Sequence, residues 1–563
     1  MLIEVACSGA NFAPLPLNHT VKKLFLIGAI SLAVTGANAS SPYASVLTTS
    51  GDRSQQLTES EVEPAGTSTT DDAIVLTDRT AQEIDGFGFA LTYASCYNLS
   101  RMPESERKAL LEKTFSPTGG YGVSYVRISI GCNDFSSKLY TLADFKGPDS
   151  DPLQNFSLSA DEKDYVIPVL KEILAMNPGL KIFASPWTAP LWMKVDDNTN
   201  KNFKPEWTGR RLYEGYRRVY GDYFVRFIRA MAAEGITIHA VSPQNEPLNW
   251  GNCASMYMPY AEEADFVRDG LAPALHDAGL ATKIYLYDHN YDYDNKSDGN
   301  DSQTDYPVKA YARMGDRFDG ADLVAGACYH NYGGTVKDIE KTVVWGNYQE
   351  KELLFSEASI GEWNDGRNLA ARLAADMNEI IIEPSLRRFR GSIVWNFMLD
   401  TNKEPYLPGG CSTCYGAVDL NASNHSDYTF NSHYIIMAQT SAAVKPGAHR
   451  VDTEGWWTDG LSYAAYRNPD NTGAVLLSNT SDRSITARVR SAAGNTYSLD
   501  VPPRGVVAAR LDLDKDETTL IAAPAADDSA GPVRYFNLLG REVSAPSPGS
   551  MYITSRGQKI IYR

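Results

Sequence analysis

Two glutamates in the sequence stand in surroundings that favour chemistry. Glu246 lies in the motif Asn245-Glu246-Pro247, and Glu357 follows Ser356. Each comes after a short run of apolar residues, where a buried strand would end. If the two strand ends meet, the carboxyl groups could share the work of cleaving a glycosidic bond, one as the acid and the other as the nucleophile.

The elements that would bring these glutamates together are eight apolar runs, each leading into a polar loop and a helical stretch. Amphipathic spacing is clear in 218–232, where apolar residues recur at the helical period. Strand and helix alternate in this way through ~350 residues, which predicts a closed (β/α)8 barrel. The predicted strands are 83–92, 124–130, 180–185, 236–242, 283–287, 323–329, 352–356 and 392–397.

An open, doubly wound sheet is the alternative α/β fold. It is disfavoured because the glycine pair Gly86 and Gly88 lacks the third glycine of a dinucleotide-binding turn, and no phosphate-binding loop of the Walker type occurs in the sequence. In a closed barrel the active site forms at the C-terminal ends of the strands. The polar residues that follow the apolar runs are therefore the candidates for function.

On this register Glu246 ends the fourth strand and Glu357 the seventh, so both point into the mouth of the barrel. A separation of about 5–5.5 Å would mean retention of the anomeric configuration, and about 6.5–9.5 Å would mean inversion. We predict the shorter separation. The structural alternative is that each glutamate forms a salt bridge with an arginine. Asn245 argues against it because its amide could donate to a sugar 2-hydroxyl, while Pro247 ends the strand.

Composition indicates a folded protein and excludes one class of partner. The 563 residues are 43% hydrophobic and 21% charged, enough for a large core and an appended domain. Lys and Arg number 52 against 69 Asp and Glu, for a net charge of −17. This charge repels phosphate backbones and anionic lipids, so we expect no nucleic-acid partner.

The N-terminal residues 1–39 have the parts of a secretory signal. Lys22 and Lys23 precede the apolar run 24–34, and small residues follow at 37–39. The run is too short to span a bilayer, so we expect no stable membrane insertion and a periplasmic or secreted protein. The residues before Val21 are unusual for a signal, which suggests a true start near that position.

Three further segments depart from the barrel pattern. Residues 40–71, rich in Ser, Thr and Glu, are expected to form a flexible leader. From 441 to 513 strand-like runs replace helical spacing, which indicates a β-sandwich. An Asp- and Ala-rich linker, 514–532, leads to a tail, 533–563, with the pattern of two β-hairpins. The tail resembles the C-terminal modules of secreted Bacteroidota proteins, some of which are sorting signals.

The cysteines do not form a disulfide scaffold, because the long mature chain keeps only a few. Cys411 and Cys414 form one Cys-x-x-Cys motif, which could be half a zinc site or a redox pair. No second such motif and no histidine at ligand spacing accompany it. We therefore predict a local disulfide that closes a loop.

Motifs in the order and spacing of a known family extend over residues 74–512. The sequence resembles glycoside hydrolase family 30, which contains glucosylceramidases and microbial β-1,6-glucanases. The motifs that carry the resemblance are 84–88, 126–128, 184–192, 245–247, 356–358 and 395–396.

The resemblance implies the roles of the two glutamates and the domain boundaries. Glu246 would be the acid/base and Glu357 the nucleophile, with retention. The family builds its β-sandwich from both ends of the chain, so residues 72–81 would add a strand to it and 82–440 would be the catalytic barrel.

Other site residues follow from the same motifs. Trp187 and Trp395 would border the sugar, although both rings could simply pack the barrel. Arg127 would lie near Glu357 and keep it ionised, unless it forms only a structural salt bridge. His330 and Tyr332 would hydrogen-bond the sugar and the nucleophile, unless they are ordinary loop residues.

One departure from the resembled glucosylceramidases concerns substrate choice. They have an aspartate after the threonine of the first strand motif, where this chain has Tyr93, a candidate substrate contact. The missing aspartate favours an endo-acting enzyme over an exo-acting one. We therefore expect an endo-β-1,6-glucanase that acts on β-glucan. We also expect the protein to be a monomer. The alternatives are a glucosylceramidase-type exo-β-glucosidase, a β-xylosidase or fucosidase of the family, or a carbohydrate-binding protein without catalysis.

No cofactor or metal is expected, since two carboxylates suffice for the reaction. The acidic loop 288–301, taken with Asp305, partly matches a calcium loop, but Lys296 occupies a ligand position. As the acid, Glu246 is expected to have a pKa raised by burial and by the charge of Glu357.

Overall fold

The computed structural model describes most of the chain between residues 44 and 512 and four short strands beyond it. The predicted signal segment 1–39, the linker 514–532 and residues 294–301 of the acidic loop lie outside the described residues. The described ranges are 44–65, 72–196, 205–293, 302–341, 348–491 and 494–512, with the short strands between 535 and 561.

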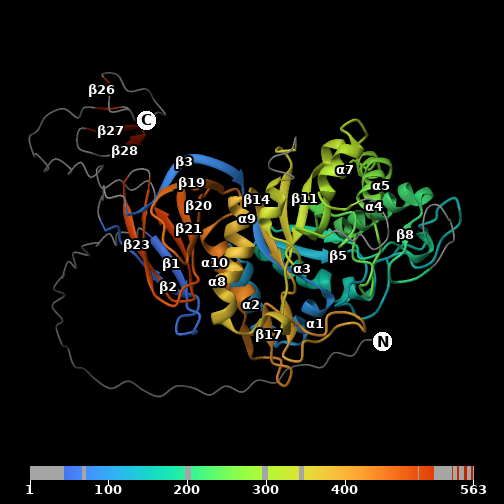
Figure 1. The fold of residues 1–563 in the computed structure, drawn as a ribbon, viewed down its shortest axis with the longest axis horizontal. Helices are drawn as coiled ribbons and strands as arrows, with labels where there is room; N and C mark the ends of the chain where they lie inside the picture. Colours follow the sequence, from blue (N-terminus) through green and yellow to red (C-terminus); the bar gives the residue numbers. More distant parts are fainter. Residues whose placement is uncertain are drawn as a thin grey trace, which may run out of the picture. The chain divides into compact units, whose positions relative to one another are not determined.

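Eight parallel strands close into a barrel, in the order β10-β11-β12-β14-β4-β5-β6-β9 (Figure 1). This confirms the predicted (β/α)8 barrel, and each predicted strand contributes one barrel strand. The barrel strands are β4 (Gly86–Ala90), β5 (Tyr125–Ser129), β6 (Lys181–Ser185), β9 (Ala240–Val241), β10 (Lys283–Asn290), β11 (Val324–His330), β12 (Glu352–Glu357) and β14 (Phe389–Val394).

A layer of side chains fills the interior of the barrel, and seven of the eight strands each supply one residue to it. Because the layer is fully buried, a ligand can reach the barrel only at its ends. The layer consists of Tyr125, Phe183, Ala240, Tyr285, Cys328, Leu354 and Ile393.

The helices cover the outside of the barrel with their apolar faces. In α4 the buried residues Tyr220, Phe224, Phe227 and Met231 recur at helical spacing, as the sequence pattern of 218–232 predicts. The helices are α1 (Tyr93–Arg101), α2 (Glu104–Phe115), α3 (Ile167–Met176), α4 (Arg217–Ala233), α5 (Tyr260–Phe266), α6 (Ala272–Asp277), α7 (Tyr306–Met314), α8 (Leu369–Asp376), α9 (Glu383–Leu386) and α10 (Ser432–Ala443).

A sheet of nine strands, mostly antiparallel, forms the second part of the fold. Its strand order is β2-β1-β24-β21-β20-β19-β3-β22-β23. Strand β3 pairs with β19 on one side and with β22 on the other, which joins the two parts of the sheet. The folded sheet encloses an apolar core that includes Val475 and Val489. Its strands are β1 (Ala44–Thr49), β2 (Thr58–Glu61), β3 (Ile74–Glu83), β19 (His449–Gly455), β20 (Leu461–Arg467), β21 (Thr472–Asn479), β22 (Ile485–Arg490), β23 (Thr496–Val501) and β24 (Val506–Asp512).

The prediction of a flexible leader over 40–71 is wrong for its described part. Strand β1 pairs antiparallel with β24 along its whole length and with β2 on its other side. Ala44 and Val46 are buried in the sandwich core. The Ser- and Thr-rich composition hid this strand, because its partner lies more than 400 residues later in the chain and supplies the apolar surface that β1 covers.

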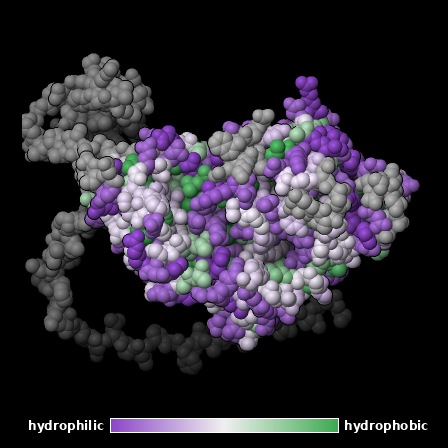
Figure 2. Space-filling model, in the orientation of Figure 1, coloured by the Kyte–Doolittle hydropathy of each residue, from purple (hydrophilic) through white to green (hydrophobic). Residues whose placement is uncertain are grey.

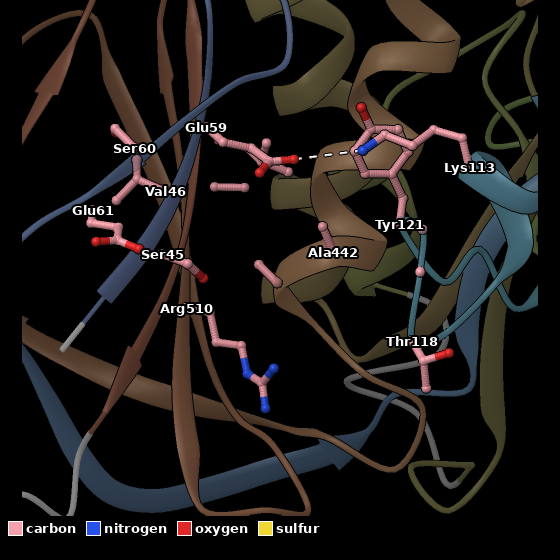
Figure 3. A pocket seen from close by; sticks show the side chains of 15 residues that line it. Ser45, Val46, Glu59, Ser60, Glu61, Lys113, Thr118, Tyr121, Ala442 and Arg510 are labelled. Atoms are coloured by element: carbon pink, nitrogen blue, oxygen red, sulfur yellow. Dashed lines mark ion pairs between the residues drawn. The ribbon is translucent and has the colours of Figure 1, made fainter. Parts of the chain in front are cut away.

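The sandwich packs against the barrel through α10 and β1. Gln439 of α10 donates a hydrogen bond to the carbonyl of Leu47 at 2.7 Å. A cavity of about 570 Å³ lies between β1 and β2 on one side and α2 and α10 on the other. Figure 3 shows Lys113 reaching across it to Glu59, with 3.5 Å between Nζ and Oε1. Both layers thus contribute side chains to this junction.

Short strands outside these two sheets pair in loops and in the tail. One ribbon, β13 with β16, lies next to the end of β12. In the tail β25 pairs with β26 and with β27, and β27 pairs with β28. The short strands are β7 (Lys194–Val195), β8 (Arg211–Leu212), β13 (Ile360–Gly361), β15 (Met398–Asp400), β16 (Cys414–Tyr415), β17 (Val418–Leu420), β18 (Tyr428–Phe430), β25 (Tyr535–Phe536), β26 (Glu542–Val543), β27 (Met551–Thr554) and β28 (Lys559–Ile561).

One face of the molecule can be compared by its hydropathy. Figure 2 shows hydrophilic side chains over most of the visible face, with apolar side chains in small patches. Among the described residues, none of the helices combines the length and apolar character that crossing a membrane requires.

Candidate active site

A cavity of about 390 Å³ opens at the C-terminal ends of the barrel strands, where the sequence predicts the active site. Three carboxylates line it, those of Asp134, Glu246 and Glu357. Amide side chains and the loop around the Cys-x-x-Cys motif complete the polar part of the wall. The aromatic rings that line it are Trp187, Tyr332, Trp363 and Trp395.

Glu246 and Glu357 meet in this cavity. Glu357 is the last residue of β12, and Glu246 follows β9. One oxygen of each carboxylate lies within 4.8 Å of the other. This agrees with the predicted short separation and is well below the roughly 6.5–9.5 Å of inverting pairs.

The backbone at Glu246 is turned to aim its side chain inward. Its φ of 45° is in the left-handed region, which residues with a side chain seldom adopt. The amide of Glu246 donates to the carbonyl of Asp288 at 3.0 Å, and Asn249 Nδ2 donates to Glu246 Oε2 at 2.7 Å. These two bonds hold a conformation that is otherwise unfavourable by about 1–3 kcal/mol.

Arg127 lies under the two glutamates and is fully buried. It donates to Glu357, to Asn245 Oδ1 at 2.7 Å and to Asp288 at 2.8 Å. The contact with Glu357 is the one that the sequence predicted. Because Asn245 accepts from Arg127 with its oxygen, its Nδ2 is oriented as the donor expected to meet a sugar hydroxyl.

Trp187 and Trp395 flank Arg127 in the cavity wall. Their ring centroids lie 5.2 and 5.4 Å from the guanidinium carbon and 5.2 Å from each other. Both are almost fully buried, with 2% and 3% of their surface exposed, and both line the cavity. They therefore pack the end of the barrel and also line the cavity, and their contact with a sugar stays a prediction.

His330 and Tyr332 connect the two glutamates. His330 Nδ1 lies 3.2 Å from Glu246 and 3.7 Å from Glu357, and its Nε2 lies 3.1 Å from Asp288. The Tyr332 hydroxyl donates to Glu357 Oε1 at 3.0 Å. Both side chains are thus in the site, as the sequence suggested.

Asp288 is a buried carboxylate that the sequence analysis missed. Besides Arg127 and His330, it accepts hydrogen bonds from three serine hydroxyls at 2.6–2.8 Å. Its donors come from different strands of the barrel, so this one side chain ties their ends together. The serines are Ser185, Ser242 and Ser356.

A bulge in β10 turns Asp288 into the barrel. The register of β10 shifts between Tyr287 and His289, and both Tyr287 and Asp288 have positive φ, 76° and 55°. The sequence predicted that the strand ends at 287 and placed Asp288 in the acidic loop. A carboxylate directly after an apolar run was the signal that could have marked it.

Two family models match the chain and cover both layers of the fold. The glycosyl hydrolase family 30 TIM-barrel domain matches residues 84–412, and the β-sandwich domain of the same family matches 447–508. The barrel match alone spans more than half of the chain. The chain belongs to glycosyl hydrolase family 30.

Several relatives in family 30 have a stated activity. An endo-1,6-β-D-glucanase of Trichoderma harzianum is 31% identical over 439 residues, which is 76% of this chain and 83% of the relative. The lysosomal acid glucosylceramidase of Mus musculus is 25% identical and covers 72% of this chain and 76% of its own. The solved structure of the endo-β1,6-glucanase BT3312 is 44% identical, with a TM-score of 0.77, and covers 83% of this chain and 99% of its own.

The protonation pattern of this family 30 site differs from the prediction for Glu246. Burial raises its pKa, but the hydrogen bond from His330 and the charges of His289 and His330 outweigh burial and lower it to about 2. For Glu357, burial and the charge of Glu246 raise the pKa. The cations His330 and Arg127 lower it, but by less, so the pKa of Glu357 is raised. The expected raised pKa of Glu246 is therefore wrong for the ligand-free site.

His330 carries a proton in this site. Burial alone would lower its pKa, but the charge of Glu357 and the hydrogen bonds to Asp288 and Glu246 raise it to about 9. For Asp288, the charge of Arg127 and the contact with His330 overcome burial and hold the pKa far below its usual range. Three carboxylates thus share two buried cations.

Asp134 is a second site residue that the sequence analysis missed. Burial, with the charge of Glu357, raises its pKa to about 7. It follows β5, the strand that carries Arg127, and its Oδ2 accepts from the amide of Cys411 at 3.4 Å. A carboxylate soon after a barrel strand was again the signal.

Tyr93 is not among the residues that line the cavity. It is the first residue of α1 and packs against Tyr97 and Tyr165, with ring centroids 5.6 and 5.0 Å away. The predicted local disulfide, in contrast, is present between Cys411 and Cys414, and both cysteines line the cavity.

One group of potential metal ligands occurs among the described residues, and it is this site. Glu246, His330 and Glu357 present ligand atoms within 4.8 Å of one another. A cation would have to replace the proton on His330 and approach the guanidinium of Arg127. Both charges oppose it, so the donor set suits proton chemistry better than a metal.

Proposed function

We propose that the protein is an endo-β-1,6-glucanase that cleaves with retention, with Glu357 as the nucleophile and Glu246 as the acid/base. The observation that carries the proposal is the meeting of these two carboxylates within 4.8 Å in one open cavity. This spacing leaves room for a sugar carbon between them and suits two successive displacements.

In the first step Glu357 attacks the anomeric carbon while Glu246 protonates the departing oxygen. Arg127 and Tyr332 each hold one oxygen of Glu357, which fixes the direction of attack. Asn245 offers its Nδ2 to the neighbouring sugar hydroxyl. In the second step Glu246 takes a proton from water, which then releases the sugar from Glu357.

The first step needs a proton on Glu246 and an ionised Glu357. His330 can supply that proton, because its Nδ1 lies 3.2 Å from Glu246 and 3.7 Å from Glu357. Transfer of the Nδ1 proton to Glu246 leaves His330 neutral, so the total number of protons is unchanged. Positive charge developing on the sugar favours the ionised Glu357.

The β-1,6 linkage is supported by relatives of this chain. BT3312 and the Trichoderma harzianum protein are both described as endo-1,6-glucanases, and the former is 44% identical over 83% of this chain. One observation favours the exo-acting alternative: Asp134 gives the cavity a third carboxylate that could hold the outer hydroxyls of a terminal sugar.

Product analysis separates these two activities. Incubation with linear β-1,6-glucan should release a series of oligosaccharides before glucose accumulates, and NMR should show the β-anomer first. Release of glucose alone from the first minutes, or faster cleavage of an aryl glucoside or glucosylceramide, would contradict the endo assignment. Initial release of the α-anomer would contradict retention.

We also propose that the protein acts outside the cytoplasm as a monomer. The signal-like segment 1–39 supports export. N-terminal sequencing of the exported protein should begin after Ala39, and light scattering should give the mass of one chain. Retention of the full precursor in the cytoplasm would contradict export.

A further inference from the structure

Trp363 is a large aromatic residue that the mechanism does not use. It lines the active-site cavity, yet 52% of its surface is exposed. Trp187 and Trp395 in the same wall are nearly buried. An exposed indole at the edge of a catalytic cavity presents its apolar face to whatever lies beyond the reacting sugar.

The backbone that carries Trp363 is tied to the disulfide loop. β13 pairs with β16, with Gly361 opposite Cys414. The amide of Glu362 donates to the carbonyl of Thr413 at 3.0 Å, inside the loop that the disulfide closes. The indole is therefore mounted on a cross-linked ribbon that forms part of the cavity wall.

Gly361 supports the ring from one side. A Cβ at this position would lie 1.9 Å from Cζ3 of Trp363, so only glycine leaves room for the indole where it stands. The glycine amide donates to Asn364 Oδ1 at 3.0 Å, which fixes the turn that carries the ring. The ring is thus placed before any ligand arrives.

We propose that Trp363 is a stacking platform for a glucosyl unit next to the one being cleaved, and that the Cys411–Cys414 disulfide positions it. This inference rests on the proposed endo-glucanase function. A sugar presents a face of C–H groups that packs on an aromatic ring. A β-1,6-linked chain has an extra rotatable bond at each linkage, so a platform fixed in advance lowers the entropy lost when the chain binds.

The direct test compares W363A on two substrates, linear β-1,6-glucan and an activated dinitrophenyl β-glucoside, which occupies only the position of the reacting sugar. We expect kcat/KM on the glucan to fall by about 10- to 100-fold and kcat/KM on the aryl glucoside to change by less than about 2-fold. W363F, which keeps a ring, should retain most of the glucan activity. W457A is the matched control, because Trp457 is 63% exposed and does not line the cavity.

Each outcome decides a separate point. Cleavage of β-1,6-glucan by wild type with no change in W363A overturns the platform, and so does an equal loss on both substrates, which would mean damage to the catalytic pair. A wild-type protein that leaves β-1,6-glucan intact contradicts the proposed function itself.

Two further variants test how the ring is held. G361A keeps the indole, but the added Cβ would collide with the ring and displace it. This variant should therefore show the same selective loss of glucan activity as W363A. C411S/C414S should raise KM for the glucan by about 3- to 10-fold with little change in kcat. An unchanged KM in both variants would overturn the role of the disulfide ribbon.

Discussion

The two ends of the barrel both hold charged clusters, but only the N-terminal end has as many cations as carboxylates. At the N-terminal end of the strands, three carboxylates meet three cations, with Glu83 paired to Arg390 at 3.4 Å. Asp85 pairs with Lys181 and with Arg390, at 3.0 Å to Nε. Glu352 pairs with Lys283 at 2.8 Å. Each carboxylate therefore has a cation of its own.

At the C-terminal end the carboxylates outnumber the cations. Glu246, Asp288 and Glu357 share Arg127 and His330. Asp288 contacts both cations, so the two glutamates compete with it for the same two positive charges, and their pKa values move apart. The ion pairs at the N-terminal end stabilise the barrel. At the C-terminal end the excess of carboxylates over cations makes proton transfer and nucleophilic attack possible.

The largest effect is expected when the nucleophile is removed from the reactive end. E357Q should lower kcat by about 10⁴-fold or more, because no other carboxylate in the cavity can form the covalent bond. Measurement of kcat on β-1,6-glucan tests this. E352Q is the matched control, since Glu352 begins the same strand, β12, at the other end. A comparable loss of kcat in E357Q and E352Q would contradict the claim that only the C-terminal end of the barrel is catalytic.

The next largest effect concerns the acid/base. E246A should lose about 10³-fold on β-1,6-glucan but much less on a dinitrophenyl glucoside, whose leaving group needs no proton. Azide should then accelerate turnover and yield β-glucosyl azide. Equal loss on both substrates, without rescue by azide, would argue that Glu246 has another role.

A smaller effect is expected from the carboxylate that holds the shared cations. D288N should lower kcat by about 10- to 100-fold, since Arg127 and His330 lose their common partner. Removing this negative charge also lowers the pKa of His330 from about 9, so the alkaline limb of the pH–rate profile should move to lower pH. S185A, which removes one hydrogen bond to Asp288 and keeps the charge, should leave that limb in place. A D288N profile that does not move would contradict the positioning role.

The smallest effect on activity is expected at the N-terminal end. D85N should change kcat by less than about 2-fold but lower the free energy of unfolding at pH 7 by about 2–3 kcal/mol. Burial raises the pKa of Asp85, but Arg390 and Lys181 lower it to about 2, against 3.8 for the free group. Its contribution is therefore complete above about pH 4 and is lost as the pH falls through 2. Urea unfolding from pH 7 to pH 2 should show the two proteins converging, and a constant difference would contradict the account.

Much of the site could be predicted because its residues end regular strands. Glu357 and His330 are the last residues of β12 and β11, and Arg127 lies near the end of β5. Apolar runs mark such positions in the sequence, and parallel strands bring their ends together.

The rest depends on geometry that the pattern does not encode. Asp288 enters the barrel through a bulge with two positive φ values, and no propensity in the sequence announces that bulge. The pKa values of the glutamates depend on burial and on contacts made after folding, such as that of His330, which lies 3.2 Å from Glu246 and 3.7 Å from Glu357. Strand β1 needs a partner, β24, from the other end of the chain.

The central claim is that Glu357 forms a covalent bond with the sugar. Incubation with an activated 2-deoxy-2-fluoro-β-glucoside should trap this intermediate, because the fluorine slows its hydrolysis more than its formation. Peptide mass spectrometry should then locate the added sugar on Glu357 in the wild type and show none in E357Q. A label on Glu246, or turnover of the reagent with no covalent adduct at any stage, would contradict the account.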